Sequence, residues 1–132
     1  MISNWLAVAP LIAAQLVAID EVSNLRIVSG IPEAQALAKE NFELFVAWGG
    51  DQPKDSAGQG SVVSVYQRWA VILTAAPGQD AGPLMSQVLK ALTGVKLSEE
   101  SQEFHYAGSS AGLFDGRFLY FPMYFTTQVF IS

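Results

Sequence analysis

Residues 117–131 read Arg-Phe-Leu-Tyr-Phe-Pro-Met-Tyr-Phe-Thr-Thr-Gln-Val-Phe-Ile, the most apolar run of the chain. Asp115-Gly116, a strong hairpin signal, comes directly before this run, which is therefore predicted to be a long closing strand. Fully extended, such a strand spans about 50 Å, whereas a globule of this chain length is roughly 36 Å across. Pro122 cannot donate to a neighbouring strand, so it is predicted to mark an edge or a bulge where the strand bends. Apolar residues on both faces of the strand indicate that both faces are covered.

The rest of the chain alternates between apolar runs and turn signals. Residues 62–75 predict a second long strand, with Val65, Trp69 and Leu73 on one of its faces. The other expected elements, in chain order, are a helix ending near residue 20, a strand at 25–28, a short helix at 32–39, a strand at 42–48, a polar loop at 49–60, a helix at 80–93 and a short strand at 103–107.

The first helix is apolar almost all the way round, with Gln15 as its polar interruption, and Pro10 is predicted to kink it. No Lys or Arg precedes it, and no clear cleavage site follows, so a signal peptide is disfavoured. Its fifteen-residue apolar segment would rise about 22 Å, short of the ~30 Å of a bilayer core. A helix of this kind needs cover on more than one side, and we expect it to be buried.

Strands joined by short turns favour an antiparallel or mixed sheet. The predicted fold is α+β in two layers, with a mostly antiparallel or mixed sheet of about four to five strands and two main helices packed on one face. The length of 132 residues fits a single domain spanning 1–132.

Composition indicates that part of the surface is hidden against other molecules. Apolar residues make up 51% of the chain and charged residues 14%, against roughly 25% charged in an ordinary soluble domain. An alternative is that Ala, Gly, Ser and Gln solvate the surface well enough. The chain contains no Cys, which excludes disulfides and thiolate metal sites. With a net charge of −5 and scattered Lys and Arg, nucleic acid is not expected to be bound, although DNA sliding through an acidic passage is compatible.

Local patterns for catalysis are weak. His105 lies near Ser109, Ser110 and Asp115 in sequence, but no nucleophile-elbow motif surrounds the serines, and turn chemistry explains them more simply. A transition-metal site would rest on carboxylates and this single His. No dinucleotide or phosphate-loop motif follows a strand. The sequence therefore predicts no catalytic, metal or cofactor site, and a protein that is not an enzyme.

The layout resembles phage tail terminator proteins, the family that includes lambda's minor tail protein U and its relatives in Mu-like phages. Four elements carry the resemblance, which covers nearly the whole chain and rests on the order and texture of the elements. They are the N-terminal helix through Ile19, the strand Val-Tyr-Gln-Arg-Trp-Ala-Val-Ile-Leu at 65–73, the helix after Pro77-Gly78, and Phe-Asp-Gly-Arg-Phe-Leu-Tyr-Phe-Pro-Met-Tyr-Phe at 114–125.

The resemblance implies a structural virion protein that is assembled in the host cytoplasm. Such proteins form a ring, usually a homo-hexamer, on the head-proximal end of the tail tube, stop tube polymerisation and offer a joining surface to the head. The implied partners are other copies of the chain, the tail tube protein and a head-completion or connector protein, with no membrane and no cofactor, and with DNA passing through unbound. The resemblance is also compatible with a monomer before assembly. Alternatives are another head–tail neck or tail-completion protein, or a small ligand-binding or enzymatic α/β domain.

Ring closure requires two different, complementary patches on each subunit. The exposed side of the first helix and the closing strand are the expected patches, and the polar loop is expected to contact the tube or connector or to line the lumen. The interface residues expected are Trp5, Val8, Ile12, Phe118, Tyr120, Phe121 and Tyr124, and the loop residues are Asp51, Gln52, Lys54 and Asp55.

Overall fold

A computed structural model describes residues 6–53, 63–98 and 101–131 of the chain. Within them lie three helices and six strands, so the predicted α+β class is correct, while the sheet has more strands than the four to five expected. The elements are α1 (Val8–Leu16), β1 (Asn24–Val28), α2 (Ile31–Leu37), β2 (Glu43–Pro53), β3 (Val63–Ala75), α3 (Gly82–Leu92), β4 (His105–Ser109), β5 (Leu113–Phe114) and β6 (Leu119–Ile131).

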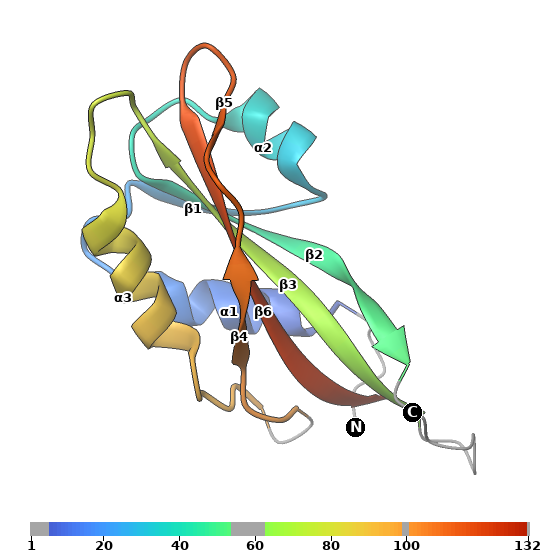
Figure 1. Cartoon of the computed structure of the whole chain (residues 1–132). Coiled ribbons are helices and arrows are strands. Elements are labelled where there is room, and N and C mark those ends of the chain that lie inside the picture. Colours follow the sequence, from blue (N-terminus) through green and yellow to red (C-terminus); the bar gives the residue numbers. More distant parts are fainter. Residues whose placement is uncertain (1–5, 54–62, 99–100, 132) are drawn as a thin grey trace.

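The strands form one mixed sheet in the order β1-β2-β3-β6-β4, and β5 pairs with β6 (Figure 1). β1 and β2 are parallel, and the other pairs are antiparallel. The parallel pair follows from the connection, because α2 lies between the two strands and carries the chain back to the start of the sheet. β3 and β6 pair along their whole length and form the centre of the sheet.

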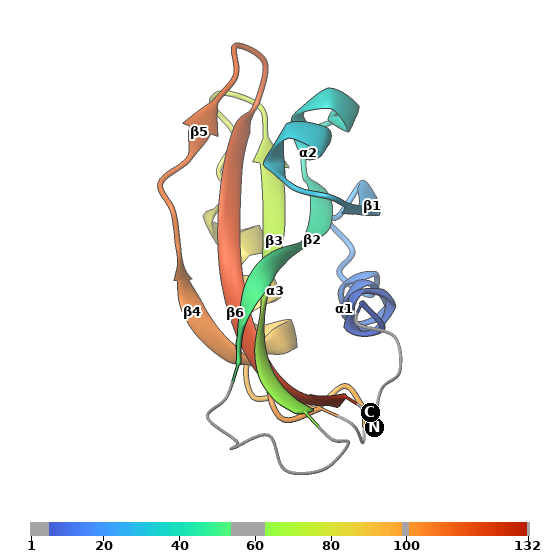
Figure 2. The same cartoon turned by 90° about the vertical axis from the view of Figure 1, so that its right-hand side faces the viewer.

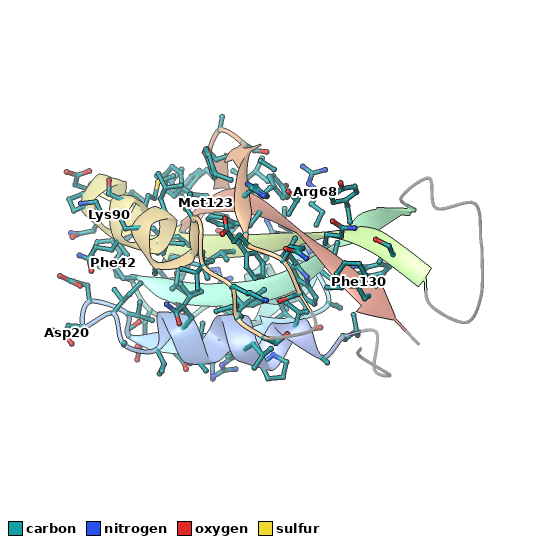
Figure 3. All side chains as sticks on the ribbon, turned by 90° about the horizontal axis from the view of Figure 1, so that it is seen from below. Asp20, Phe42, Arg68, Lys90, Met123 and Phe130 are labelled. Carbon is teal, nitrogen blue, oxygen red and sulfur yellow. The ribbon has the colours of Figure 1, made fainter. Side chains whose placement is uncertain are left out.

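Each face of the sheet has its own apolar core. The larger core joins α1 and α3 to the face that carries Leu44, Trp69, Val71 and Met123. The smaller core packs Ala34 of α2 and the following Ala38 on the opposite face, which carries Phe45, Ile72 and Tyr120. Figure 3 shows side chains filling the space between the sheet and the two longer helices. The expectation that two main helices share one face therefore agrees with the observed packing.

Pro122 was predicted to mark an edge or a bulge, and the edge alternative is wrong, because Pro122 lies on an inner strand. β6 is flanked by β3 on one side and by β4 and β5 on the other. The carbonyl of Pro122 accepts a hydrogen bond from Ser110 N at 3.2 Å. In a strand the N–H and C=O of one residue point to the same side, so the missing N–H of Pro122 also faces β4 and β5. The outer strand is interrupted at this place, between Ser109 and Leu113.

The polar loop expected from residue 49 begins later than predicted. β2 continues to Pro53 through a register shift between Trp48 and Asp51. Gly49 and Gly50 occupy this shift, and Gly50 has a φ of 100°, which a residue with a side chain rarely adopts. The two glycines thus form a bulge that bends the strand, and the sheet does not end there.

A buried polar pair fixes the centre of the larger core. The indole N–H of Trp69 donates to Gln67 Oε1 at 3.1 Å, and both side chains are buried. We predict that Gln67→Leu lowers the free energy of unfolding by about 1–3 kcal/mol, because the buried indole N–H loses its acceptor. Urea unfolding followed by tryptophan fluorescence measures this loss.

The control is the double variant Gln67→Leu/Trp69→Phe compared with Trp69→Phe alone. When the indole N–H is absent, removing its acceptor is expected to cost much less than it does in the wild type. An equal cost in both backgrounds would contradict the assigned role of this hydrogen bond.

Candidate assembly surfaces

Large apolar side chains remain exposed mainly in two places, at opposite edges of the sheet. The first place is the N-terminal part of α1 together with β1 and β2, and the second is the outer strand β4–β5. The exposed large apolar residues are Leu6, Val17, Ile27, Trp48, Tyr66, Tyr106, Leu113 and Phe114. Of these eight, Val17 follows the C-terminal end of α1 and Tyr66 lies on the open face of the sheet, while the other six lie at the two edges.

The first surface is a hollow of about 380 Å³, which we call the α1–β1 groove. Its lining carries no charged group and is mostly apolar. The residues are Leu6, Ala9, Pro10, Ile27, Val28, Ser29, Trp48 and Trp69. Trp69 is the buried tryptophan of the larger core. Ile27, which also lines the groove, is 49% exposed. A concave apolar site of this kind suits an aromatic or aliphatic side chain.

The groove exists because α1 is covered on one side only. Val8, Ile12 and Leu16 point into the larger core, at the three- to four-residue spacing of a helix face. Pro10 and Val17 lie on the other side and are exposed. The expectation that this apolar helix needs cover on more than one side is thus met on one side by the sheet, and its outer side is left without cover within the described chain.

The second surface, the β4–β5 edge, consists of Tyr106, Leu113 and Phe114. Phe114 is 59% exposed and Leu113 is 46% exposed. The Tyr106 ring lies 5.7 Å from the ring of Phe125, and its hydroxyl is 2.9 Å from Ser109 Oγ, to which it donates. Leu113 and Phe114 pair with β6 on one side and have an open strand edge on the other. Such an edge is a template for contact with another chain.

The turn beside Phe114 is held by Asp115. Its carboxylate accepts hydrogen bonds from the Phe118 and Arg117 backbone N–H groups, both at 2.9 Å, and from the Tyr120 hydroxyl at 2.7 Å. These bonds, the Phe118 N–H first, hold the pKa of Asp115 well below its usual value. Burial, and next the bond to Asp115, raise the pKa of Tyr120 to about 12.

Arg117 ties this turn to α2. Its guanidinium donates to the backbone carbonyls of Gln35 at 2.7 Å and Ala38 at 3.1 Å, and it forms a salt bridge of 3.4 Å with Asp115. Gly112 packs closely against the Phe121 ring, and a Cβ atom at this position would lie 2.8 Å from that ring. The β4–β5 edge is therefore presented from a supported hairpin.

The two surfaces lie on opposite sides of the molecule. Figure 2 shows β4 and β5 at one side of the sheet and β1 with α1 at the other. The strand order places β2, β3 and β6 between them. One chain therefore cannot bring its own two surfaces together.

The open part of the opposite sheet face is more polar. Arg68 places its guanidinium carbon 4.0 Å from the centre of the Tyr124 ring, and Gln128 donates to Ser64 at 2.5 Å. Tyr66 is partly exposed beside them. Arg68 thus covers the Tyr124 ring, and these polar groups leave this face less apolar than the two edges.

Several residues expected at the interface lie inside the subunit instead. Val8, Ile12 and Tyr120 are buried in the two cores and have no surface to offer, so their assignment to an interface is wrong. Phe118, Phe121 and Tyr124 are half-buried. Phe121 and Tyr124 lie on β6, which is an inner strand, and Phe118 directly precedes it.

The loop residues and Trp5 are only partly described. Asp51 and Gln52 belong to β2, opposite Gln67 and Tyr66 of β3, and not to a loop. Trp5, Lys54 and Asp55 lie outside the described residues.

The structure gives the catalytic candidates other tasks. Asp115 is occupied by the hairpin turn, and Ser109 Oγ accepts from Tyr106. Within residues 6–53, 63–98 and 101–131, no cluster of three or more potential metal ligands occurs. No helix in the same ranges is long and apolar enough to cross a membrane.

The residues that form the two edges were not singled out from the sequence. Ile27 and Trp48 lie in predicted strands, but which strand is at an edge depends on the pairing order. Leu113 and Phe114 precede the Asp115-Gly116 turn, and a hairpin turn implies a strand before it as well as after it. That signal could have identified β5, although only the strand after the turn was predicted.

We predict that Tyr120→Phe lowers the free energy of unfolding by about 1 kcal/mol, because the hydroxyl loses its hydrogen bond while the ring still fills the smaller core. Tyr124→Phe is the matched control, and its stability is expected to stay close to that of the wild type. Urea unfolding of both variants measures the difference, and equal midpoints would contradict the role of the hydroxyl.

The same turn makes stability depend on pH. The folded pKa of Asp115 is depressed, so its contribution to stability is present above the ordinary pKa of 3.8 and is lost as the pH falls below it. The folded pKa of Tyr120 is raised, so its contribution is present below 10.0 and is lost as the pH rises towards about 12. Asp115→Asn is expected to flatten the acid limb, and an unchanged acid limb would contradict this assignment.

Comparison with known proteins agrees with this architecture. A family model described as phage tail terminator protein matches residues 1–132. Among solved structures, the chain is similar to a chain of the "virion of native gene transfer agent (GTA) particle", at 16% identity and a TM-score of 0.64, with 96% of this chain and 98% of that chain covered. At this identity the likeness concerns the fold. No curated protein matches. Because the family model spans the whole sequence, the chain belongs to the phage tail terminator protein family.

Proposed function

We propose that this chain, as a single-domain subunit, closes into a ring on the head-proximal end of the phage tail tube. The ring stops tube polymerisation and offers the joining surface for the head. Family membership makes the chain a structural protein of phage tails, and the placing of apolar surface at two opposite edges of its sheet supports the ring.

The two edges support this proposal because a contact between two different surfaces can repeat from one subunit to the next. Such a repeat generates a ring when the rotation between successive subunits closes the circle. The α1–β1 groove and the β4–β5 edge are different in shape and lie across the sheet from each other. A subunit of this kind gains apolar burial at both edges by joining two neighbours. A homo-hexamer is the expected size, and a monomer is expected before the tube is met.

The partners are the tail tube protein on one face of the ring and a head-completion or connector protein on the other. DNA passes through the ring without specific binding, because the net charge of −5 disfavours contact with phosphates. The protein resides in the virion after assembly in the host cytoplasm. No enzymatic activity, cofactor or membrane is part of this role.

Deleting the gene from the phage or prophage that carries it tests the role directly. Without a terminator, tube subunits continue to add, so electron microscopy of the lysate is expected to show tubes longer than normal and without heads. The wild-type chain supplied from a plasmid restores the normal length. Ser86→Ala, a change on the exposed side of α3, serves as a neutral control in the same assay.

Two other outcomes have clear meanings. Tails of normal length that fail to join heads would assign the chain to the neck or to tail completion instead. Normal infectious particles in the deletion strain would contradict a structural role at either place.

A further inference from the structure

We infer that α2 is a lid over one part of the sheet, and that Arg117 is the strap that holds this lid closed. The inference concerns a single chain in solution and does not rest on the proposed ring. It gives the hairpin turn at Asp115 a task beyond the support of β5, because the turn then controls whether the sheet beneath α2 stays covered.

The α2 lid covers only part of its sheet face. Beneath it lie Phe45, Ile72 and Tyr120, all of which are fully buried. Successive side chains of a strand alternate between faces, so Tyr66, Arg68 and Ile72 share one face of β3. Tyr66 and Arg68 are exposed, whereas Ile72 is covered. Opening of α2 therefore extends the exposed face along β3 and adds apolar surface to a part of the sheet that is otherwise polar.

The apolar contact between α2 and the sheet is small. α2 has seven residues, whereas an isolated helix needs roughly 12–15 to be even marginally stable in water, so α2 depends on its packing. Its fully buried side chain is Ala34, and the residue directly after it, Ala38, is buried as well. A methyl group contributes much less burial free energy than the leucine side chains that α3 buries, such as Leu84 and Leu92. Local opening is therefore expected at α2 before it occurs at α3.

The two ends of the lid differ in how they are anchored. At the N-terminal end, the carboxylate of Glu33 accepts hydrogen bonds from the N–H and the hydroxyl of Ser29, at 3.2 and 2.7 Å. These bonds stay within the segment and do not attach it to the sheet. At the C-terminal end, the N–H of Lys39 donates to the buried carboxylate of Glu43 on β2 at 2.7 Å. The part that can open without breaking this anchor is therefore residues 30–38.

The strap reaches the lid from the far end of the chain. The Arg117 guanidinium donates to the carbonyls of Gln35 at 2.7 Å and Ala38 at 3.1 Å. A helix leaves the carbonyls of its last turn without partners, and a cation there also suits the helix dipole. Among the residues that the structure describes, no other hydrogen bond joins 30–38 to a distant segment. The Arg117 side chain is 54% exposed, so water competes for these bonds and the strap can release.

The strap connects the lid to the hairpin turn. Asp115 accepts a hydrogen bond from the backbone N–H of Arg117 at 2.9 Å and forms the salt bridge with its guanidinium. Figure 1 shows α2 beside the end of the hairpin that joins β5 to β6. Because one residue is both braced by the turn and bonded to α2, a change at the turn alters the stability of the closed lid. By the same linkage, opening of the lid alters the turn.

Native-state hydrogen exchange of the wild-type chain tests the lid without any substitution. The reporters are the amides of Ala34 and Ala38, which are hydrogen-bonded at 3.1 and 2.9 Å, and the amides of β3 serve as the reference for global unfolding. We expect the two α2 amides to exchange at least about tenfold faster than the β3 amides. We also expect their exchange to respond weakly to low urea concentrations, because a local opening exposes little surface.

Arg117→Gln tests the strap. We expect this variant to speed exchange of the α2 amides about a further tenfold, the effect of losing hydrogen bonds from a charged donor, while the exchange of β3 changes much less. Arg68→Gln is the matched control, because Arg68 lies on the same side of the sheet and contacts the Tyr124 ring. It is expected to leave the exchange of α2 relative to β3 unchanged.

A second pair of variants tests the connection to the turn. Asp115→Asn weakens the brace of Arg117 and is expected to speed α2 exchange relative to β3. Phe114→Ala removes an exposed neighbour that makes no part of the brace, and it is expected to leave that ratio unchanged. Circular dichroism establishes that each variant is folded.

Three results would overturn the inference. If the wild-type α2 amides exchanged together with those of β3 at every urea concentration, α2 would not be a lid. If Arg117→Gln sped exchange equally in α2 and β3, Arg117 would stabilise the whole fold and would not be a strap. If Asp115→Asn left the ratio unchanged, the turn would not control the lid. None of these results bears on the terminator role, which the deletion experiment tests separately.

Discussion

A sheet that stays open at both edges is the constraint on which the rest of this structure depends. β3 and β6 pair over their full length, with the larger core on one face and the smaller core on part of the other, so the centre of the sheet is paired within one chain. At one edge of the sheet, β1 pairs only with β2. At the other edge, β4 and β5 pair only with β6. Natural proteins usually protect such edges with charge or cover. Here the exposed large apolar side chains gather beside them.

Pro122 helps to shape one of these edges. The missing N–H of Pro122 is on the side of β6 that faces β4 and β5. The outer strand therefore cannot pair with β6 continuously, and it is divided into β4 and β5. The short β5 then belongs to a hairpin that Asp115 and Arg117 brace against α2. An apparent defect in the central strand thereby produces a separate, supported hairpin with Phe114 on it.

The sequence was sufficient for elements whose signal is local. Residues 62–75 and the Asp115-Gly116 turn gave β3 and the final hairpin, and the resemblance to tail terminators is confirmed by the family model. Pairing order was not readable, because it depends on contacts between distant segments. For this reason the sequence left open whether Pro122 marks an edge or a bulge, and Val8, Ile12 and Tyr120 were predicted at an interface, although they fill the cores. Gly49-Gly50 predicts a loop as readily as a bulge, because glycine pairs are typical of both, and the structure has the bulge.

The central claim is that both edges of the sheet become buried when copies assemble. Hydrogen–deuterium exchange, compared between the free chain and the chain on tails, tests it most directly, because open-edge amides exchange readily until a neighbour covers them. The account predicts added protection in peptides that contain β1 and in those that contain β5, in the same sample. Unchanged exchange at both edges, with new protection confined to the open sheet face around Tyr66 and Arg68, would contradict it.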